Sequence, residues 1–124
     1  MPYKDPTVRR SKIAEYMRRR YHTDPVYREA QREAVRNNKA KTRVAIQQVI
    51  SEAKAVGCLL CRREDEPCCL GFHHLDPAVK EFSIGNAYAR ALSPARLRAE
   101  LAKCVCLCHN CHAKLHAGLV QLLP

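Results

Sequence analysis

Two pairs of cysteines, each pair separated by two residues, constrain this 124-residue chain more than any other feature. The first pair is Cys58 and Cys61, and the second is Cys108 and Cys111. Two cysteines at this spacing can bind one ion from a single tight turn, and two such turns complete a tetrahedral shell of thiolates. This ligand set suits zinc and leaves no open coordination position. The spacing therefore predicts a structural zinc site that joins two distant segments.

Four histidines beside the cysteine pairs predict a second cluster of metal-binding type. His112 and His116 are four residues apart, so on a helix both imidazoles face the same way. His73 and His74 are adjacent on an expected strand, where neighbours point to opposite faces and need not share a role. A structural zinc site needs no such cluster, so we interpret the four histidines as a catalytic site. In the alternative reading, His112 caps or replaces a zinc ligand and His73 is an ordinary half-buried residue.

The order of these motifs resembles that of the HNH endonucleases, the zinc-stapled branch of the ββα-metal nucleases. The resemblance covers about residues 58–118 and rests on Cys-x-x-Cys, then Phe-His-His-x-Asp-Pro-x-x-Lys-Glu-Phe, then Cys-x-Asn-Cys-His-x-x-x-His. It implies an α+β fold with a small, treble-clef-like ββα-metal core. It also implies metal-dependent hydrolysis of DNA, by nicking or double-strand cleavage, that leaves 5′-phosphate and 3′-hydroxyl ends.

The resemblance assigns a role to each of the four histidines. His74 would be the general base that activates water. His73, His112 and His116 would bind a catalytic divalent metal, for which Mg²⁺, Mn²⁺ and Ni²⁺ are the candidates. Imidazole ligands suit transition metals better than magnesium, although magnesium can still act in the cell.

The chain departs from the family pattern at the middle position of the motif. Nine residues before His112, where many HNH enzymes carry Asn, it has Lys103, and Asn110 is the other candidate. The middle residue orients the catalytic histidine by accepting its Nδ1–H, which fixes the tautomer. If a backbone carbonyl performs this role, Lys103 can substitute, because every residue has one.

Positive charge is concentrated in the first half of the chain. The net charge of +10 favours a polyanionic partner, and residues 1–57 carry 14 Lys and Arg against 6 Asp and Glu. We therefore divide the chain into a basic helical arm, residues 1–57, and a nuclease domain, residues 58–124. The expected contacts to DNA, taken as a duplex, are Arg9, Arg10, Lys12, Arg18, Arg19, Arg20, Arg28 and, between the strands, Lys80.

The arm has two further readings. Tyr16, Tyr21 and Tyr27 are interleaved with the arginines and could stack on bases. A charge run is more commonly a solvated helix, and this segment could also be disordered without DNA. Lys80 and Arg90 could contact phosphate or simply be solvated.

Local signals predict where several helices begin and end. Asp24 and Pro25 are typical of a helix start, and the helical pattern then continues from Val26 to about Val56, where Gly57 ends it. Within it a stripe of four apolar residues should pack on the nuclease core: Ile46, Val49, Ile50 and Ala53.

The motif half should contain two strands and two short helices. The strands are expected at residues 68–74 and 103–107, and residues 78–92 should be mostly irregular. Ser93 and Pro94 should open a helix, with Leu92 and Leu97 in contact across its start. The last helix should begin at Asn110 and end near residue 118.

The first residues, the hydropathy of the chain and its cysteines together indicate the cellular compartment. The first residues lack an apolar signal-peptide core and no run is long enough to span a membrane, so we expect a cytoplasmic protein. Paired cysteines in a reducing compartment more often hold metal than form disulfides. Cys104 and Cys106 are expected in the core, and a second zinc shared with Cys68 and Cys69 stays open.

The short length and the basic arm resemble phage or prophage HNH proteins, which implies a bacterial host cell and phage DNA-processing partners. The alternative function is a non-catalytic zinc module that binds DNA or RNA. That reading uses the four zinc-binding cysteines and the basic arm but gives His74 no role.

Overall fold

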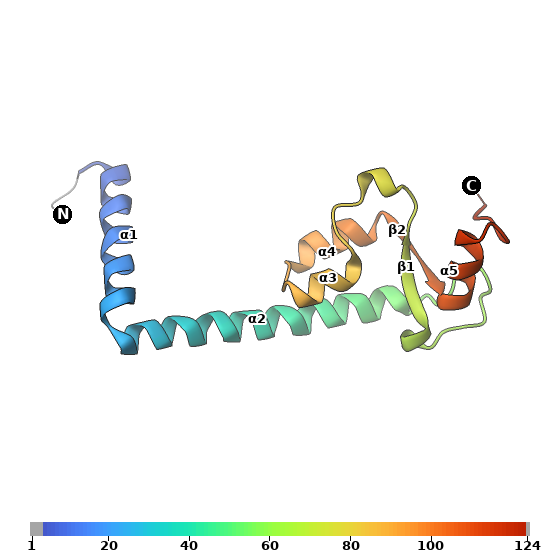
Figure 1. The fold of residues 1–124 in the computed structure, drawn as a ribbon, viewed down its shortest axis with the longest axis horizontal. Helices are drawn as coiled ribbons and strands as arrows, with labels where there is room; N and C mark the ends of the chain where they lie inside the picture. Colours follow the sequence, from blue (N-terminus) through green and yellow to red (C-terminus); the bar gives the residue numbers. More distant parts are fainter. Residues whose placement is uncertain (1–3, 124) are drawn as a thin grey trace. The chain divides into compact units, whose positions relative to one another are not determined.

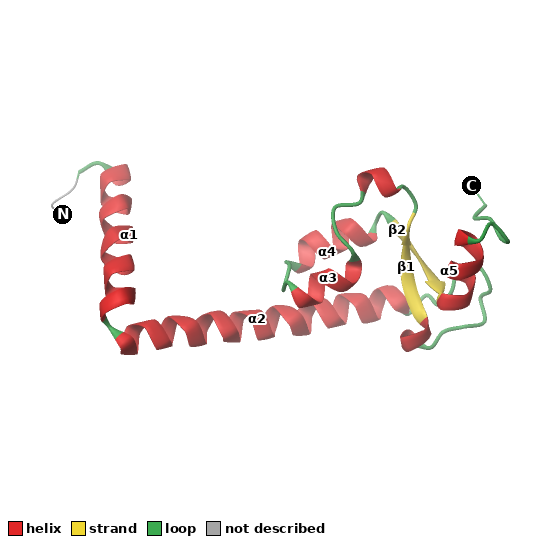
Figure 2. Ribbon diagram, viewed as in Figure 1, coloured by secondary structure: helices red, strands yellow, loops and turns green. Residues whose placement is uncertain are grey.

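The computed structural model describes residues 4–123, which form an α+β protein that is mostly helical and has one two-stranded antiparallel sheet. The α+β class predicted from the sequence is confirmed. Figures 1 and 2 show the elements in order: α1 (Pro6–Thr23), α2 (Pro25–Lys54), η1 (Pro67–Cys69), β1 (Leu70–His74), η2 (Pro77–Val79), α3 (Ile84–Ala89), α4 (Pro94–Leu101), β2 (Cys104–Cys108) and α5 (His109–His116).

The chain divides into two units, one that ends at Lys39 and one that begins at Ala40. This division falls within α2, whereas the sequence placed the boundary at residue 57. Ile46 and Val49, on the C-terminal half of α2, are both buried in the core of the second unit. The apolar stripe of α2 therefore packs as predicted.

Between α1 and α2 the chain stops and restarts at Asp24, as the sequence predicts. The carboxylate of Asp24 accepts hydrogen bonds from the backbone N–H groups of Val26 and Tyr27, both at 3.1 Å. These bonds satisfy donors that have no partner within the helix, and Pro25 takes the first helical position.

The second unit has two hydrophobic clusters, and the sheet contacts both. One lies against α2 and consists of Ile46, Val49, Phe82, Ile84, Ala87, Leu92 and Leu97. The other surrounds the paired cysteines and includes Leu70 and Leu107. β1 pairs with β2 from Leu70 opposite Cys108 to His74 opposite Cys104, and the half-buried Phe72 packs against both clusters.

The prediction that residues 78–92 are mostly irregular is wrong, because they include α3. Gly85 and Asn86 are weak helix formers, so local propensity hides this short helix. Its apolar residues Ile84 and Ala87 are three apart and are both buried in the first cluster. Tertiary packing therefore outweighs local preference here.

Other local predictions hold. The Ser93 hydroxyl accepts the backbone N–H of Arg96 at 3.2 Å and caps α4, with Leu92 and Leu97 buried at its start. Gly118 follows α5 with a φ of 76°, a left-handed conformation that suits glycine. α5 itself begins at His109, one residue before the predicted start.

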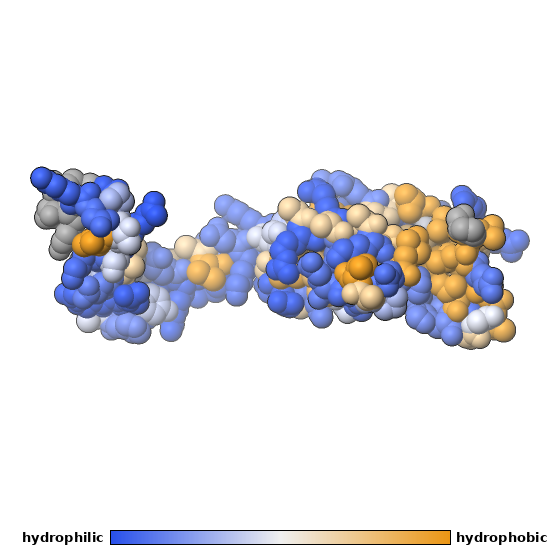
Figure 3. All heavy atoms as spheres, turned by 90° about the horizontal axis from the view of Figure 1, so that it is seen from above, coloured by the Kyte–Doolittle hydropathy of each residue, from blue (hydrophilic) through white to orange (hydrophobic). Residues whose placement is uncertain are grey.

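The two units differ in their surfaces (Figure 3). Hydrophilic residues dominate the surface of the first unit in this view, and no residue of α1 is buried. In the second unit, hydrophobic residues reach the surface toward the end that carries α5. Leu59, Leu75, Leu119 and Leu123 are among the exposed hydrophobic residues of this unit. Among the described residues, no helix is both long enough and apolar enough to cross a membrane.

Candidate functional site

The four paired cysteines meet in space and could hold a structural metal such as zinc. Cys58 and Cys61 lie in the turn after α2, Cys108 ends β2 and Cys111 lies in the first turn of α5. Their sulfur atoms all lie within 4.8 Å of one another, and those of Cys61 and Cys108 are 4.0 Å apart. Four thiolates bound tetrahedrally at about 2.3 Å from zinc lie about 3.8 Å apart, so the donor atoms fit this ion.

The electrostatics of this cluster also favour a cation. Burial opposes ionisation of Cys58, but backbone hydrogen bonds, foremost that of Cys108, outweigh it and lower the pKa of Cys58 to about 6. Burial and the neighbouring thiols raise the pKa of Cys111 to about 12. Four thiolates cannot share this space without a positive charge between them, and a divalent ion supplies that charge.

Three histidines form a second cluster between β1 and α5. The ring nitrogens of His73, His112 and His116 lie within 4.8 Å of one another. Nδ1 of His73 is 3.3 Å from Nε2 of His112, which is 3.0 Å from Nε2 of His116. Two imidazoles bound to one ion at about 2.05 Å have nitrogens about 2.9 Å apart at a right angle and about 3.3 Å apart at a tetrahedral angle. The donor set therefore fits one transition-metal ion.

The three rings differ in exposure, as suits a metal site that is open to solvent on one side. His73 and His112 are half-buried, whereas His116 is exposed. Burial, and then the nearby rings, lower the pKa of both His73 and His112, which favours the neutral imidazole that metals bind. Because His112 lies with the other two histidines and the four thiols form their own group, His112 does not replace a zinc ligand.

His74 lies apart from these three rings. Its Nε2 is 2.9 Å from Oε1 of Glu100 on α4, and only 10% of its side chain is exposed. His74 also lines a groove of about 350 Å³ together with Lys54 and Lys80. An imidazole and two ammonium groups thus border one hollow, which favours an anionic ligand.

Glu100 is a site residue that sequence reasoning missed. Its side chain is 1% exposed, and a hydrogen bond from Lys103 is the main cause that lowers the pKa of Glu100 to about 2. Its spacing in the sequence could have revealed that Glu100 is buried, because it lies three residues after the buried Leu97, on the face of α4 that packs inward. A carboxylate on an apolar helix face requires a partner.

The two candidates for the middle position lie in different surroundings. The ammonium group of Lys103 donates to Oε2 of Glu100 at 2.9 Å and to the carbonyl of Val79 at 2.8 Å. Its own carbonyl accepts the N–H of Leu75 at 3.0 Å, so Lys103 reaches His74 through Glu100. Asn110 is exposed on the first turn of α5, and no hydrogen bond within residues 4–123 joins it to His74.

The predicted DNA-binding Arg and Lys residues on α1 are all exposed, but they differ in their contacts. Lys12 and Arg19 both pair with Glu15 at 3.5 and 3.6 Å. No ion pair or hydrogen bond within the described chain engages the side chains of three others, Arg9, Arg10 and Arg18. These three are the cations of α1 that are most readily available to an anionic partner.

The tyrosines of the arm are not equivalent. The guanidinium of Arg20 lies 4.3 Å from the ring centroid of Tyr27, and the Tyr21 hydroxyl accepts a hydrogen bond from Arg32 at 3.2 Å. Arg28 donates to the Tyr21 carbonyl at 3.5 Å. Tyr16 is 58% exposed, so among these three it is the ring most open to stacking.

The remaining four cysteines do not form a second four-thiol site within residues 4–123. Cys68 and Cys69 are neighbours in η1 with sulfur atoms 3.8 Å apart. Cys104 packs against the first cluster, where its thiol donates to the Glu100 carbonyl at 3.4 Å, and Cys106 is buried in the second. The expectation of core positions for Cys104 and Cys106 therefore holds.

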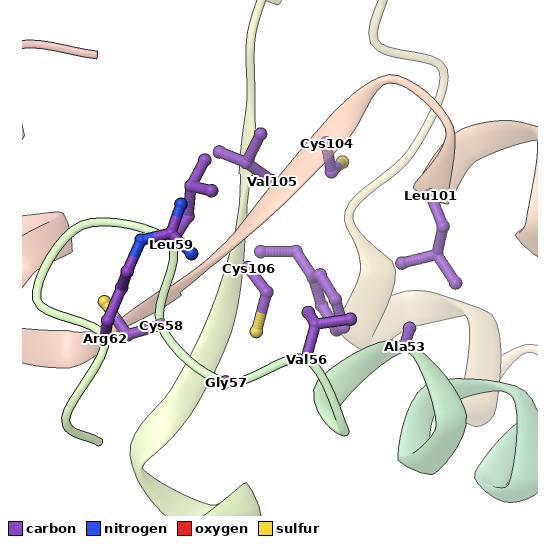
Figure 4. Close-up of a pocket in the computed structure, with 11 residues that line it drawn as sticks. Ala53, Val56, Gly57, Cys58, Leu59, Arg62, Leu101, Cys104, Val105 and Cys106 are labelled. Atoms are coloured by element: carbon purple, nitrogen blue, oxygen red, sulfur yellow. The ribbon is translucent and has the colours of Figure 1, made fainter. Parts of the chain in front are cut away.

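Figure 4 shows a mostly apolar cavity of about 380 Å³ at the end of α2, lined by residues such as Val56, Leu59 and Leu101. None of the four histidines of the candidate site lines it. The hollow that bears on the chemistry is therefore the groove beside His74.

Comparisons of the chain with protein-family models, with curated proteins and with solved structures find no significant match.

Proposed function

We propose that this protein is a metal-dependent HNH endonuclease that hydrolyses phosphodiester bonds of DNA. One observation carries the proposal: three imidazoles from β1 and α5 lie at the spacing of ligands to one ion, and the next residue of β1 is a histidine held by a buried carboxylate. A structural zinc site explains neither feature.

In this proposal His73, His112 and His116 would hold the divalent ion. When bound, such an ion stabilises negative charge on the phosphoryl oxygens and on the leaving alkoxide. His74 takes the proton from the attacking water as general base. Lys80, and with it Lys54, attracts the DNA backbone to the groove beside His74.

The cysteine site would serve the histidine site through α5. Cys111 immediately precedes His112, and Cys108 caps α5, its sulfur accepting the Cys111 N–H at 3.4 Å. A zinc ion bound by these thiolates would fix the start of α5 against the turn after α2. It would thereby hold His112 and His116 opposite His73.

The proposed substrate is duplex DNA, contacted also by the basic residues of α1. Such contacts neutralise phosphates without reading sequence. By resemblance to phage and prophage HNH proteins, we propose a role in phage DNA processing inside a bacterial cell.

The direct test incubates supercoiled plasmid with the zinc-loaded full chain and added Mg²⁺, Mn²⁺ or Ni²⁺. We expect nicked or linear product only with an added ion. A parallel sample receives a chelator at a concentration at which the measured zinc content is unchanged, and cleavage should stop. The exposed His22 on α1 provides the matched control, because His22→Ala should cut like the wild type.

The result of this plasmid test also distinguishes the nuclease function from the second candidate function. If the folded, zinc-loaded protein retards DNA but cuts under none of these conditions, the nuclease proposal fails. A non-catalytic zinc module that binds nucleic acid would then be the better description. That function is favoured by the cysteine cluster and by the arginines of α1 that have no side-chain partner within the described residues.

A further inference from the structure

Glu100 is the buried charged residue of this fold within residues 4–123. Removing a carboxylate from water is costly unless its oxygens are paired and hydrogen-bonded. In Glu100 this requirement is met: Oε1 is bonded to His74 Nε2 at 2.9 Å and to the backbone N–H of Glu81 at 3.0 Å, and Oε2 accepts from Lys103 at 2.9 Å. No buried side-chain nitrogen or oxygen of the described chain lacks a partner.

This network joins segments that are far apart in the sequence. Glu100 belongs to α4, His74 is the last residue of β1, and Glu81 follows η2. Lys103 adds a second bond to the carbonyl of Val79, so it anchors the carboxylate to the same loop. The carboxylate is therefore fixed in position before any substrate arrives.

The contact with Glu100 determines which nitrogen of His74 carries the proton. An ionised carboxylate has no proton to give, so the Nε2 of His74 must be the donor in this hydrogen bond. A neutral imidazole with its proton on Nε2 has its lone pair on Nδ1. When Nδ1 takes a proton from water, the adjacent carboxylate stabilises the positive charge that the ring acquires.

We propose that Glu100 is the positioning residue for His74: it holds the ring in the Nε2–H tautomer and leaves Nδ1 as the basic nitrogen. Lys103 acts through Glu100 by pairing with its second oxygen. Glu100 thus orients the ring from the Nε2 side, whereas the middle residue of the HNH motif accepts Nδ1–H, and Lys103 at that position takes part through its bond to Glu100. The catalytic part rests on the proposed nuclease function, whereas the tautomer does not.

The first test measures the tautomer in the zinc-loaded full chain. Long-range ¹H–¹⁵N spectra distinguish a protonated from an unprotonated ring nitrogen, and His74→Ala identifies the signal of His74. We expect the Nε2–H form in the wild type and a loss of this preference in Glu100→Gln. An Nδ1–H form in the wild type overturns the proposal. This measurement on the wild type stays valid even if the Glu100→Gln variant does not fold.

The second test measures single-turnover DNA cleavage at saturating metal. Glu100→Gln should lower the rate by between about 10²- and 10⁴-fold, the range that a general base contributes. Glu33→Gln is the matched control, because Glu33 is exposed on α2 and takes no part in the network around Glu100. Zinc content and circular dichroism of each variant report whether the fold is retained.

The two tests separate this inference from the proposed function. A wild-type protein that shows the Nε2–H form but cuts no DNA would refute the nuclease function and leave the Glu100–His74 contact established. A folded Glu100→Gln variant that keeps both the wild-type tautomer and the wild-type cleavage rate would refute the positioning role.

Discussion

His74 has surroundings unlike those of the other histidines, and its replacement should therefore have a distinct effect. We predict that His74→Ala lowers cleavage by about 10²–10⁴-fold while DNA affinity and zinc content stay near those of the wild type. Glu100 would keep its bonds to Lys103 and to the Glu81 N–H, so the core should tolerate the change. Plasmid nicking, a binding titration and metal analysis check this, and nicking at the wild-type rate would contradict it.

Cys108 and His116 test whether the two metal clusters have different tasks. Serine is itself a good helix cap, so Cys108→Ser removes a zinc ligand while a hydroxyl can still cap α5. We predict that this variant loses zinc and unfolds the second unit, because binding of the structural ion is folding free energy. His116→Ala, at an exposed position, should stay folded, keep its zinc and bind the catalytic metal more weakly.

Zinc analysis, circular dichroism and a metal titration distinguish these two variants. Equal folding and equal inactivity of both would mean that the division into a structural and a catalytic site is wrong.

At the scale of an element, α1 is an exposed helix with no buried residue, and three of its arginines have no ion pair or hydrogen bond from their side chains within residues 4–123. Affinity gained by neutralising phosphates falls with salt, at a slope of about −0.9 in log K per log salt for each contact on duplex DNA. If half of the 11 Lys and Arg side chains before Ala40 contact phosphate, a protein that starts at Ala40 should have a slope flatter by about five units. Cleavage at low salt and saturating DNA should survive, because all proposed catalytic residues lie later in the chain.

A sharper variant keeps the helix and removes only three free cations. Replacing Arg9, Arg10 and Arg18 together by Ala breaks no ion pair or hydrogen bond of the described chain and should flatten the slope by about 2.7 units. The loss should be similar on unrelated duplexes. Titrations of DNA binding against salt measure both slopes. An unchanged slope in both proteins would mean that α1 binds a protein partner instead of DNA.

At the scale of the whole molecule, zinc binding should make folding of the second unit depend on pH. Protons compete with zinc for thiolates, so affinity falls as the pH falls. Cys58, with a pKa of about 6, is ionised at neutral pH and protonated below that value, whereas Cys111, with a pKa of about 12, gives up a proton at any pH in this range. The hydrogen bonds that lower the pKa of Cys58 exist only in the folded unit, so the prediction applies where circular dichroism shows that the zinc-free unit is folded. Under such conditions we predict that a plot of log zinc affinity against pH steepens by about one unit of slope below pH 6.

Competition with a zinc indicator between pH 5 and 8 measures this curve. Cys68→Ser removes a thiol that lies outside the four-cysteine group and should leave the curve unchanged. A constant slope through pH 6 would show that the fold does not lower the pKa of Cys58.

The sequence alone determined those features that depend on short spacings. The two Cys-x-x-Cys pairs define one four-thiol group, because a single turn brings both sulfurs of a pair to one point. His112 and His116 share a helix face for the same reason. The restart at Asp24 and the cap at Ser93 were also readable, since a cap bonds to backbone groups two or three residues away.

Only the tertiary structure decided which distant groups meet. It placed His73 against α5 and His74 against Glu100, although the two are neighbours in β1. It formed α3 against local preference, because burial of Ile84 and Ala87 outweighs the weak helix formers between them. The role of Glu100 could not be read from its own segment. A buried carboxylate is stable only with partners, and here two of them, His74 and the Glu81 N–H, come from distant segments that the fold brings together, whereas Lys103 is three residues away.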